Sequence, residues 1–225
     1  MIAVFPVVDY RLYREEFNRA NGAPGADWRA ELSNPLSTIV SNALQAGAVA
    51  QNTGRQAACW WTYQGGAQGG VLGTDAVEIS AQLKAPSTSQ ASDNWTTLFL
   101  AGADTFITGK FYCGLFSTGS GCKIILCNGT PNGPGNSAST GSNQTQLATT
   151  GTNCANNAIA LFSRDVNGRM SLKVNGTEVT SATDNTGFSG VGNRRWGVCI
   201  EANRPIFQNQ FSAPGIDWVQ GRDLP

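Results

Sequence analysis

Apolar and polar residues alternate with a period of two along much of the chain, the pattern of β-strands with one buried face. The clearest example is Ala76–Leu83, where Val77, Ile79, Ala81 and Leu83 alternate with polar residues. We expect this polar face to point to water or to a ligand.

The segment from Ala158 to Thr180 predicts a three-stranded meander, because Asn167-Gly168 and Asn175-Gly176 each separate two apolar runs. An Asn-Gly pair supplies the positive φ angles of a tight hairpin turn. Further strands are expected at Trp196–Glu201 and Ile216–Val219, whereas helical spacing is weak even in Leu36–Ala50, its best stretch. About ten to twelve strands follow, which predicts an all-β, two-sheet antiparallel jelly-roll sandwich.

The predicted sandwich is one domain over residues 15–225, with a polar insertion at Asn128–Asn157 that is read as a functional loop rather than a linker. Residues 1–14 precede it as an apolar extension, which is either an assembly arm or an ordinary edge strand. The apolar residues of this extension are Phe5, Val7, Val8, Tyr10, Leu12 and Tyr13.

Composition narrows the functional classes. The 225 residues include 27 Gly and only 13% charged residues, and 15 Lys and Arg balance 15 Asp and Glu. A net charge of zero without a basic run makes nucleic acid a poor partner. No apolar stretch reaches the length of a membrane-spanning helix, and the N-terminus lacks signal-peptide features, so we expect a soluble chain that is not exported.

Catalytic chemistry is poorly supplied. The chain contains no histidine, which excludes hydrolases that depend on an imidazole base. A glycosidase would need two carboxylates. Asp75 and Glu78 are the nearest pair, but residues three apart lie on opposite faces of a strand. No catalytic residue is therefore assigned, and the protein is predicted not to be an enzyme.

No metal or other cofactor is predicted. The cysteines do not have the spacing of zinc ligands. The acidic residues considered for calcium are more typical of turns than of a metal site: Asp104, Asp165, Asp184 and Asp217. The six cysteines are expected to be buried free thiols rather than a specific set of disulfides, and a hairpin about Ser117–Ser120 would put Cys113 opposite Ile124.

Carbohydrate binding would use aromatic rings beside polar groups, because the apolar face of a sugar stacks on a ring. The candidates for ligand contact are Trp60, Trp61 and Tyr63. Trp28, Trp196 and Trp218 are expected in the core, and Arg194-Arg195 in a solvated loop rather than an anion site.

The phrase Glu15–Gly22, followed by Trp28 and by Ile39–Leu44, resembles the opening of jelly-roll domains in minor tail proteins of actinobacteriophages. Residues 164–176, with Arg164, Gly168 and Val174-Asn175-Gly176, also resemble a hairpin of the concanavalin A-like and laminin-G-like class.

This resemblance implies a structural protein of the phage virion, made in the host cytoplasm and assembled on the tail. Its implied partners are copies of itself, other virion proteins and glycans of the host surface, without membrane insertion. Two alternatives stay open: a stand-alone carbohydrate-binding module or lectin, and a capsid decoration protein.

Overall fold

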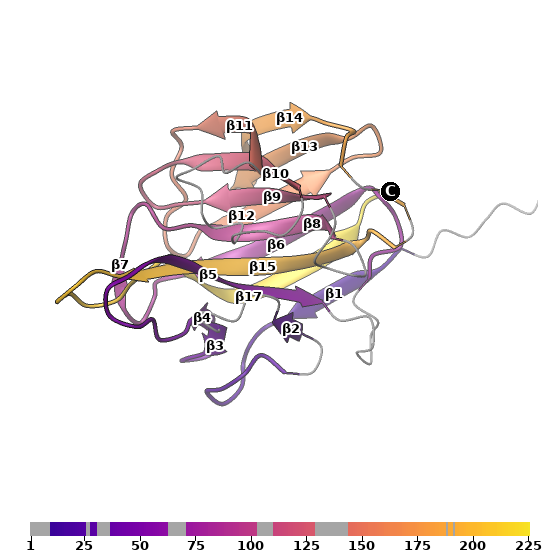
Figure 1. Cartoon of the computed structure of the whole chain (residues 1–225). Helices are drawn as coiled ribbons and strands as arrows, with labels where there is room; N and C mark the ends of the chain where they lie inside the picture. The colour runs from indigo at the N-terminus through magenta and orange to yellow at the C-terminus, as the bar shows by residue number, and fades with distance from the viewer. Residues whose placement is uncertain are drawn as a thin grey trace, which may run out of the picture.

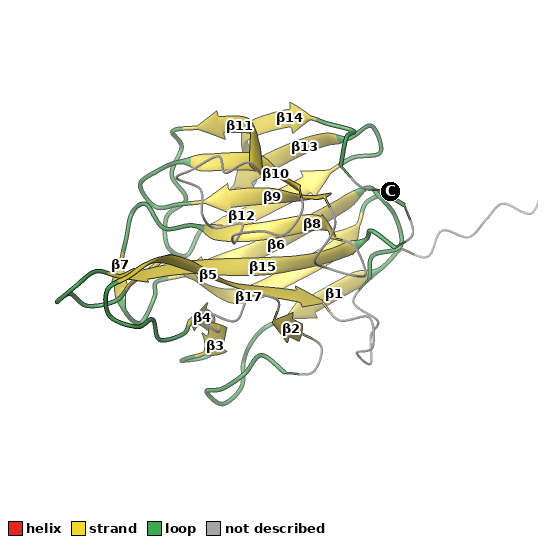
Figure 2. Ribbon diagram, in the orientation of Figure 1, coloured by secondary structure: helices red, strands yellow, loops and turns green. Residues whose placement is uncertain are grey.

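The computed structural model describes residues 10–25, 28–30, 37–62, 71–102, 110–128, 144–187, 189–190 and 192–225. Within these ranges the protein is entirely β-structure, with seventeen strands in two sheets (Figures 1 and 2). The predicted all-β sandwich is confirmed, with more strands than the ten to twelve expected. No helix capable of crossing a membrane is found in the described ranges.

Sheet A has eight strands, in the order β14-β13-β12-β6-β17-β4-β3, with β1 also paired to β17. All its pairings are antiparallel. Its strands are β1 (Leu12–Glu15), β3 (Ser37–Ile39), β4 (Leu44–Ala46), β6 (Val77–Lys84), β12 (Ile159–Arg164), β13 (Arg169–Val174), β14 (Thr177–Thr183) and β17 (Gly215–Asp223).

Sheet B has nine strands, in the order β11-β10-β9-β8-β15-β16-β7, with β5 paired to both β15 and β2. The short pairing of β16 with β7 is parallel, and the others are antiparallel. Its strands are β2 (Trp28–Ala30), β5 (Thr53–Thr62), β7 (Ser89–Gln90), β8 (Thr96–Gly102), β9 (Lys110–Phe116), β10 (Cys122–Asn128), β11 (Gln144–Thr150), β15 (Arg195–Arg204) and β16 (Phe211–Ser212).

The main core lies between the two sheets and depends on glycine where large side chains meet the opposite strand. A Cβ atom on Gly114 would come within 2.6–2.9 Å of Leu172 and Phe162, and one on Gly221 within 2.5 Å of Trp196. These positions leave space for large buried side chains. An added methyl group would overpack a core of this density.

The outward faces of the two sheets differ. On sheet A, β6 directs Glu78, Ser80 and Gln82 outward, but Glu78 and Ser80 are buried by their neighbours, so the expected solvent-facing strand face is largely covered. On sheet B the outward residues of β8, β9, β10 and β15, with Trp95 just before β8, form a second buried apolar cluster. Its members are Trp95, Phe99, Phe111, Cys113, Leu115, Ile125, Cys127 and Cys199.

The meander 159–183 is confirmed, but its two turns differ. Asn175 and Gly176 both have positive φ, as a tight two-residue hairpin requires. The turn before it spans Asp165–Gly168, and there only Gly168 has positive φ. The carboxylate of Asp165 accepts the N–H groups of Asn167 and Arg169, which stabilises this longer loop.

Two predicted boundaries were wrong. The insertion 128–157 is not a single loop, because Gln144–Thr150 forms β11 and pairs with β10. The domain does not start at residue 15, because Leu12–Glu15 forms β1 at the edge of sheet A. In the β9–β10 hairpin Cys113 stands opposite Ile125 rather than Ile124.

Candidate functional site

An open groove lies at one end of the sandwich, where β15, β16 and β7 meet, at the left of Figure 1. Its hollow measures about 610 Å³, within the usual range for small-molecule sites. Every residue that lines it is polar, and one is charged. The lining residues are Ser87, Thr88, Ser89, Arg204, Asn209 and Gln210.

The loop from β15 to β16 carries an exposed aromatic tip. Pro205 ends β15 because proline cannot donate to the strand ladder, and the N–H of Gln208 donates to its carbonyl to close a turn. Inside this turn Phe207 has a φ of 58° and is 88% exposed, beside Ile206 at 53%. A bulky residue with positive φ and an exposed ring is a local strain that points to a function.

Gln210 builds the groove and is not free to bind. Its side-chain oxygen accepts the N–H of Val49 at 2.8 Å, and its nitrogen donates to the carbonyl of Gly47 at 2.8 Å and to Ser212 Oγ at 3.2 Å. Both donors and one acceptor site of this amide are therefore used. Gln210 holds the 47–49 segment against the groove.

Other groove side chains keep hydrogen-bonding capacity. In the described part of the chain, the hydroxyls of Ser87 and Ser89 and the amide of Asn209 make no hydrogen bond, and all three residues are exposed. Thr88 Oγ1 donates to Ser212 Oγ at 2.8 Å, which leaves its lone pairs as acceptors. Arg204 uses Nε to donate to the carbonyl of Gln208 at 3.3 Å.

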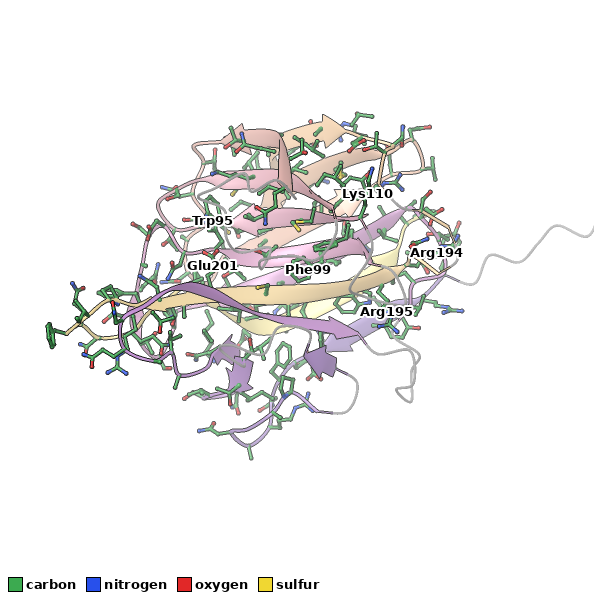
Figure 3. The ribbon with its side chains drawn as sticks, in the orientation of Figure 1. Trp95, Phe99, Lys110, Arg194, Arg195 and Glu201 are labelled. Carbon is green, nitrogen blue, oxygen red and sulfur yellow. The ribbon has the colours of Figure 1, made fainter. Side chains whose placement is uncertain are left out.

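The opposite end of the sandwich is closed by a charged network, near Arg194 and Arg195 in Figure 3. The buried carboxylate of Asp223 accepts the N–H groups of Arg11, Gly73 and Thr74 at 2.7–3.0 Å, and Thr74 Oγ1 at 3.1 Å. These bonds tie β17 to the segment before β6. The hollow in this network measures only about 10 Å³, room for one water molecule.

Asp75 and Arg194 form the second part of this network. Arg194 Nε lies 3.0 Å from Asp75 Oδ1, which also accepts the N–H of Gly190 at 2.8 Å. Burial disfavours the charged carboxylate, but these two hydrogen bonds and the charges of Arg194 and Arg164 outweigh it, so the pKa of Asp75 lies below its ordinary value. Arg194-Arg195 is thus not a solvated loop: Arg194 is paired and Arg195 is buried.

The outward face of sheet B offers no open site among the described residues. Its one described carboxylate, Glu201, is fully buried and accepts the N–H of Trp95 at 2.8 Å. Figure 3 shows Trp95, Phe99 and Glu201 on this sheet. Beside them, Cys113 Sγ and Cys127 Sγ lie 3.4 Å apart as thiols, and burial raises the pKa of Cys113.

Burial also raises the pKa values of Cys122 and Cys154 to about 12. Cys113, Cys122, Cys127 and Cys154 form no disulfide in the structure and are buried, as predicted.

The side chains of the predicted aromatic platform lie outside the described residues. Trp60 and Trp61 lie in β5 opposite Val198 and Gly197, and their side chains, like all of Tyr63, lie outside the described residues. Trp28 and Trp196 are in the core, 5.6 Å apart in an edge-on pair, as predicted.

Trp218 was wrongly placed in the core. It is partly exposed on sheet A, where its Nε1 donates to Gln82 and the guanidinium of Arg14 lies 4.3 Å from its ring.

The structure describes only three of the six apolar residues predicted at the N-terminus. Phe5, Val7 and Val8 lie outside the described residues. Leu12 and Tyr13 belong to β1, and Tyr10 lies two residues before the strand. Both Tyr10 and Leu12 are exposed. The residues from Leu12 to Glu15 therefore form an edge strand, and the assembly role of the extension stays a prediction.

The four acidic residues considered for calcium do not gather in the described structure. Asp165 and Asp184 each accept backbone N–H groups of their own turns. Asp217 forms an ion pair with Lys84 at 3.0 Å, and Asp104 lies outside the described residues.

Sequence reasoning missed the groove itself. Its lining comes from two polar stretches more than one hundred residues apart in the sequence, neither of which carries a motif. One signal was available: Ile206-Phe207 follows a proline and interrupts an otherwise polar turn. Binding residues are concentrated in loops, so an exposed apolar pair in a polar turn is a place to look for a binding surface.

Solved structures share this fold at low sequence identity. The carbohydrate recognition domain of Emp47p matches with a TM-score of 0.56 and 11% identity over 94% of this chain and 94% of that one. LamAcat from Zobellia galactanivorans matches with a TM-score of 0.53 and 12% identity over 93% of this chain and 96% of that one. β-Agarase B from the same organism matches with a TM-score of 0.53 and 10% identity over 97% of this chain and 95% of that one. No protein-family model and no curated protein sequence matches the chain.

These likenesses define the fold as a concanavalin A-like jelly-roll sandwich. They place the chain in a class of architecture that supports many unrelated functions, so function has to be argued from the site.

Proposed function

We propose that this protein is a non-catalytic carbohydrate-binding domain and that the end groove, with its aromatic tip, is the sugar site. One observation carries the proposal. Hydroxyl and amide groups without a partner among the described residues line the groove, and the exposed ring of Phe207 lies two residues from Asn209 in the same loop. Sugars need both kinds of group, because their hydroxyls form hydrogen bonds and their C–H faces stack on rings.

The fold neighbours support a sugar ligand without specifying one. One of them is named as a carbohydrate recognition domain, and another as a β-agarase. Their low identity leaves residue roles to the local geometry of this chain.

The absence of paired carboxylates from the groove lining and from the described outward face of sheet B supports binding without hydrolysis. A glycosidase places two carboxyl groups about 5–10 Å apart across the scissile bond. None of the groove-lining residues is acidic, and the described outward face of sheet B offers only Glu201, which is buried. Asp75 and Glu78 each pair with a different arginine, Arg194 and Arg222.

The test is a glycan array followed by titration calorimetry with the sugar that binds best. Phe207→Ala is expected to weaken binding by about tenfold, a loss of about 1.4 kcal/mol, because it removes the stacking ring. Val166→Ala is the matched control, since Val166 is also an exposed apolar turn residue but lies in the turn after β12, outside the groove lining. The proposal fails if no glycan binds, if both variants bind like the unaltered chain, or if the chain hydrolyses the bound glycan.

A virion setting is the second part of the proposal. It is supported by the phrase Glu15–Gly22 with its resemblance to phage tail domains, and by the exposure of Tyr10 and Leu12 beside the N-terminal segment. In this setting the apolar N-terminus docks the domain onto a copy of itself or onto another tail protein, and the groove faces host glycans.

Light scattering tests the assembly role. The variant to use lacks only residues 1–9, because Arg11 N bonds to Asp223 and β1 begins at Leu12. An oligomeric full chain and a monomeric truncated chain support an assembly arm. If the full chain and the truncated chain are both monomers and bind sugar equally well, the assembly role fails and a stand-alone lectin is supported.

A further inference from the structure

The groove is electrostatically one-sided. Arg204 is the one charged residue among those that line it, and no described acidic side chain forms an ion pair with it. Other described surface arginines are paired with acids: Arg169 with Glu178 and Arg222 with Glu78. Because the whole chain has zero net charge, the positive character of the groove is local rather than a general property of the surface.

The guanidinium of Arg204 is oriented with one edge still available. Its Nε donates to the carbonyl of Gln208 at 3.3 Å, which anchors the group to the turn that carries Phe207. In the described chain its two terminal nitrogens have no hydrogen-bond acceptor. A guanidinium presents those nitrogens as a planar fork, which matches the two oxygens of a carboxylate or of a sulfate or phosphate group.

Neighbouring groups suit the rest of an acidic sugar. Ser87, Ser89 and Asn209 can donate to anionic oxygens or bond to ring hydroxyls, and no lining carboxylate would repel the anion. A neutral sugar can accept hydrogen bonds from the guanidinium only through uncharged oxygens, and these bonds are weaker than the charge-assisted, bidentate pair that an oxyanion forms.

We infer that the groove selects anionic glycans, with Arg204 as the residue that binds the acidic group. This inference rests on the proposed sugar-binding function and specifies its ligand class. The shared chemistry is a planar or tetrahedral oxyanion on a sugar ring, which a uronic acid or a sulfated sugar can supply.

Two matched pairs of probes test the inference. Oligogalacturonides are compared with their methyl esters, and κ-carrageenan oligosaccharides with agarose oligosaccharides, on the same chain by calorimetry. The charged member of at least one pair is expected to bind at least tenfold more tightly than its neutral partner. Preference within the first pair indicates a carboxylate ligand, and within the second a sulfate.

Variants assign the preference to Arg204. Arg204→Gln is expected to remove the difference between charged and neutral probes, whereas Arg204→Lys keeps part of it because a lysine retains charge without the fork. Arg169→Gln is the matched control, since it removes one surface charge from the loop end of β13. Raising the salt concentration from 0.05 to 0.5 M should reduce the preference of the unaltered chain.

The outcomes separate the inference from the proposed function. If the glycan array and the probes reveal binding only to neutral sugars, or if Arg204→Gln keeps the preference, the anionic inference is overturned and sugar binding stands. If no glycan binds at all, the proposed function is overturned, and the inference with it. Native mass spectrometry and circular dichroism of each variant check that it keeps the oligomeric state and the fold of the unaltered chain, so that a loss of binding is not a loss of fold.

Discussion

The two ends of the sandwich contain similar residues but use them in opposite ways. Strand β15 runs from Arg195, at the closed charged network, to Arg204, in the open groove. Ten residues of strand span about 30 Å. At the closed end Asp223 and Asp75 receive hydrogen bonds from backbone and side chains, and almost no space remains. At the groove end several polar groups have no partner within the described ranges, and the hollow measures about 610 Å³.

This difference separates stabilisation from recognition. A polar group that is buried and fully bonded contributes to the free energy of unfolding, because its loss leaves partners unsatisfied. An exposed polar group contributes little to stability and is available to a ligand. Mutations at the two ends should therefore affect different measurements.

The largest stability effect is expected from Asp223→Ala. The variant leaves the N–H groups of Gly73, Thr74 and Arg11 without their acceptor at a buried site. We expect the free energy of unfolding to fall by about 3 kcal/mol in urea titrations. Asp217→Ala, which breaks the more exposed pair with Lys84, should lower it by less than about 1 kcal/mol. Equal effects would contradict the comparison.

Tyr112→Phe is expected to have the next largest effect. The phenol donates to the carbonyl of Asp184 at 3.1 Å and accepts the N–H of Gly187 at 2.8 Å, and its ring lies in the core. Losing the hydroxyl leaves both backbone groups unpaired without changing the packing, which should lower stability by about 1–2 kcal/mol. Glycan affinity, measured in parallel, should not change. A loss of glycan affinity would contradict this separation, because it would show that the Tyr112 hydroxyl affects the groove.

Asp75→Asn should alter the pH dependence of stability. The pKa of Asp75 is depressed in the folded state relative to its ordinary 3.8, so its stabilisation is fully present above that value and is lost as pH falls through the folded pKa. Unfolding in urea at pH 6 and pH 2 measures this difference. The variant should be less stable than the unaltered chain at pH 6 and similar to it at pH 2. A constant difference would exclude this linkage.

Asn209→Ala is expected to have the smallest effect on stability, within about 0.5 kcal/mol, because the exposed amide has no partner in the described chain. Its effect on glycan affinity should be clear. Gln210→Ala is the opposite case at the neighbouring position, since it removes the bonds to Gly47 and Val49 and should reduce stability. Calorimetry should therefore show the loss of affinity in Asn209→Ala, and urea titration should show the loss of stability in Gln210→Ala.

The strands were predictable because the alternation of β6, β12 and β15 is local and strong. Asn175-Gly176 likewise fixed a hairpin through its own φ preferences. Asn167-Gly168 did not form the same turn, because the carboxylate of Asp165 stabilised a four-residue loop. The strand β11 was missed because it contains a single large apolar residue, Leu147.

Burial was less predictable than strand position. Trp196 and Trp218 lie in strands with similar alternation, yet one packs opposite Gly221 in the core and the other lies partly exposed beside Arg14. The bulge between Ile216 and Trp218 sets the face on which Trp218 lies. An irregularity of one residue turns a side chain to the other face of a sheet, and sequence alternation alone does not locate it.

The sequence by itself determined an all-β chain, its main strands, the absence of imidazole chemistry and the buried state of four thiols, because these depend on composition and on neighbours along the chain. Only the tertiary structure decided which charges are neutralised and which are available. Asp75 bonds to Arg194 and Asp223 to Thr74, and Ser87 lines the same groove as Arg204, each across more than one hundred residues of sequence. Such sites depend on strand order and register, which bring together segments whose local sequences carry no record of each other.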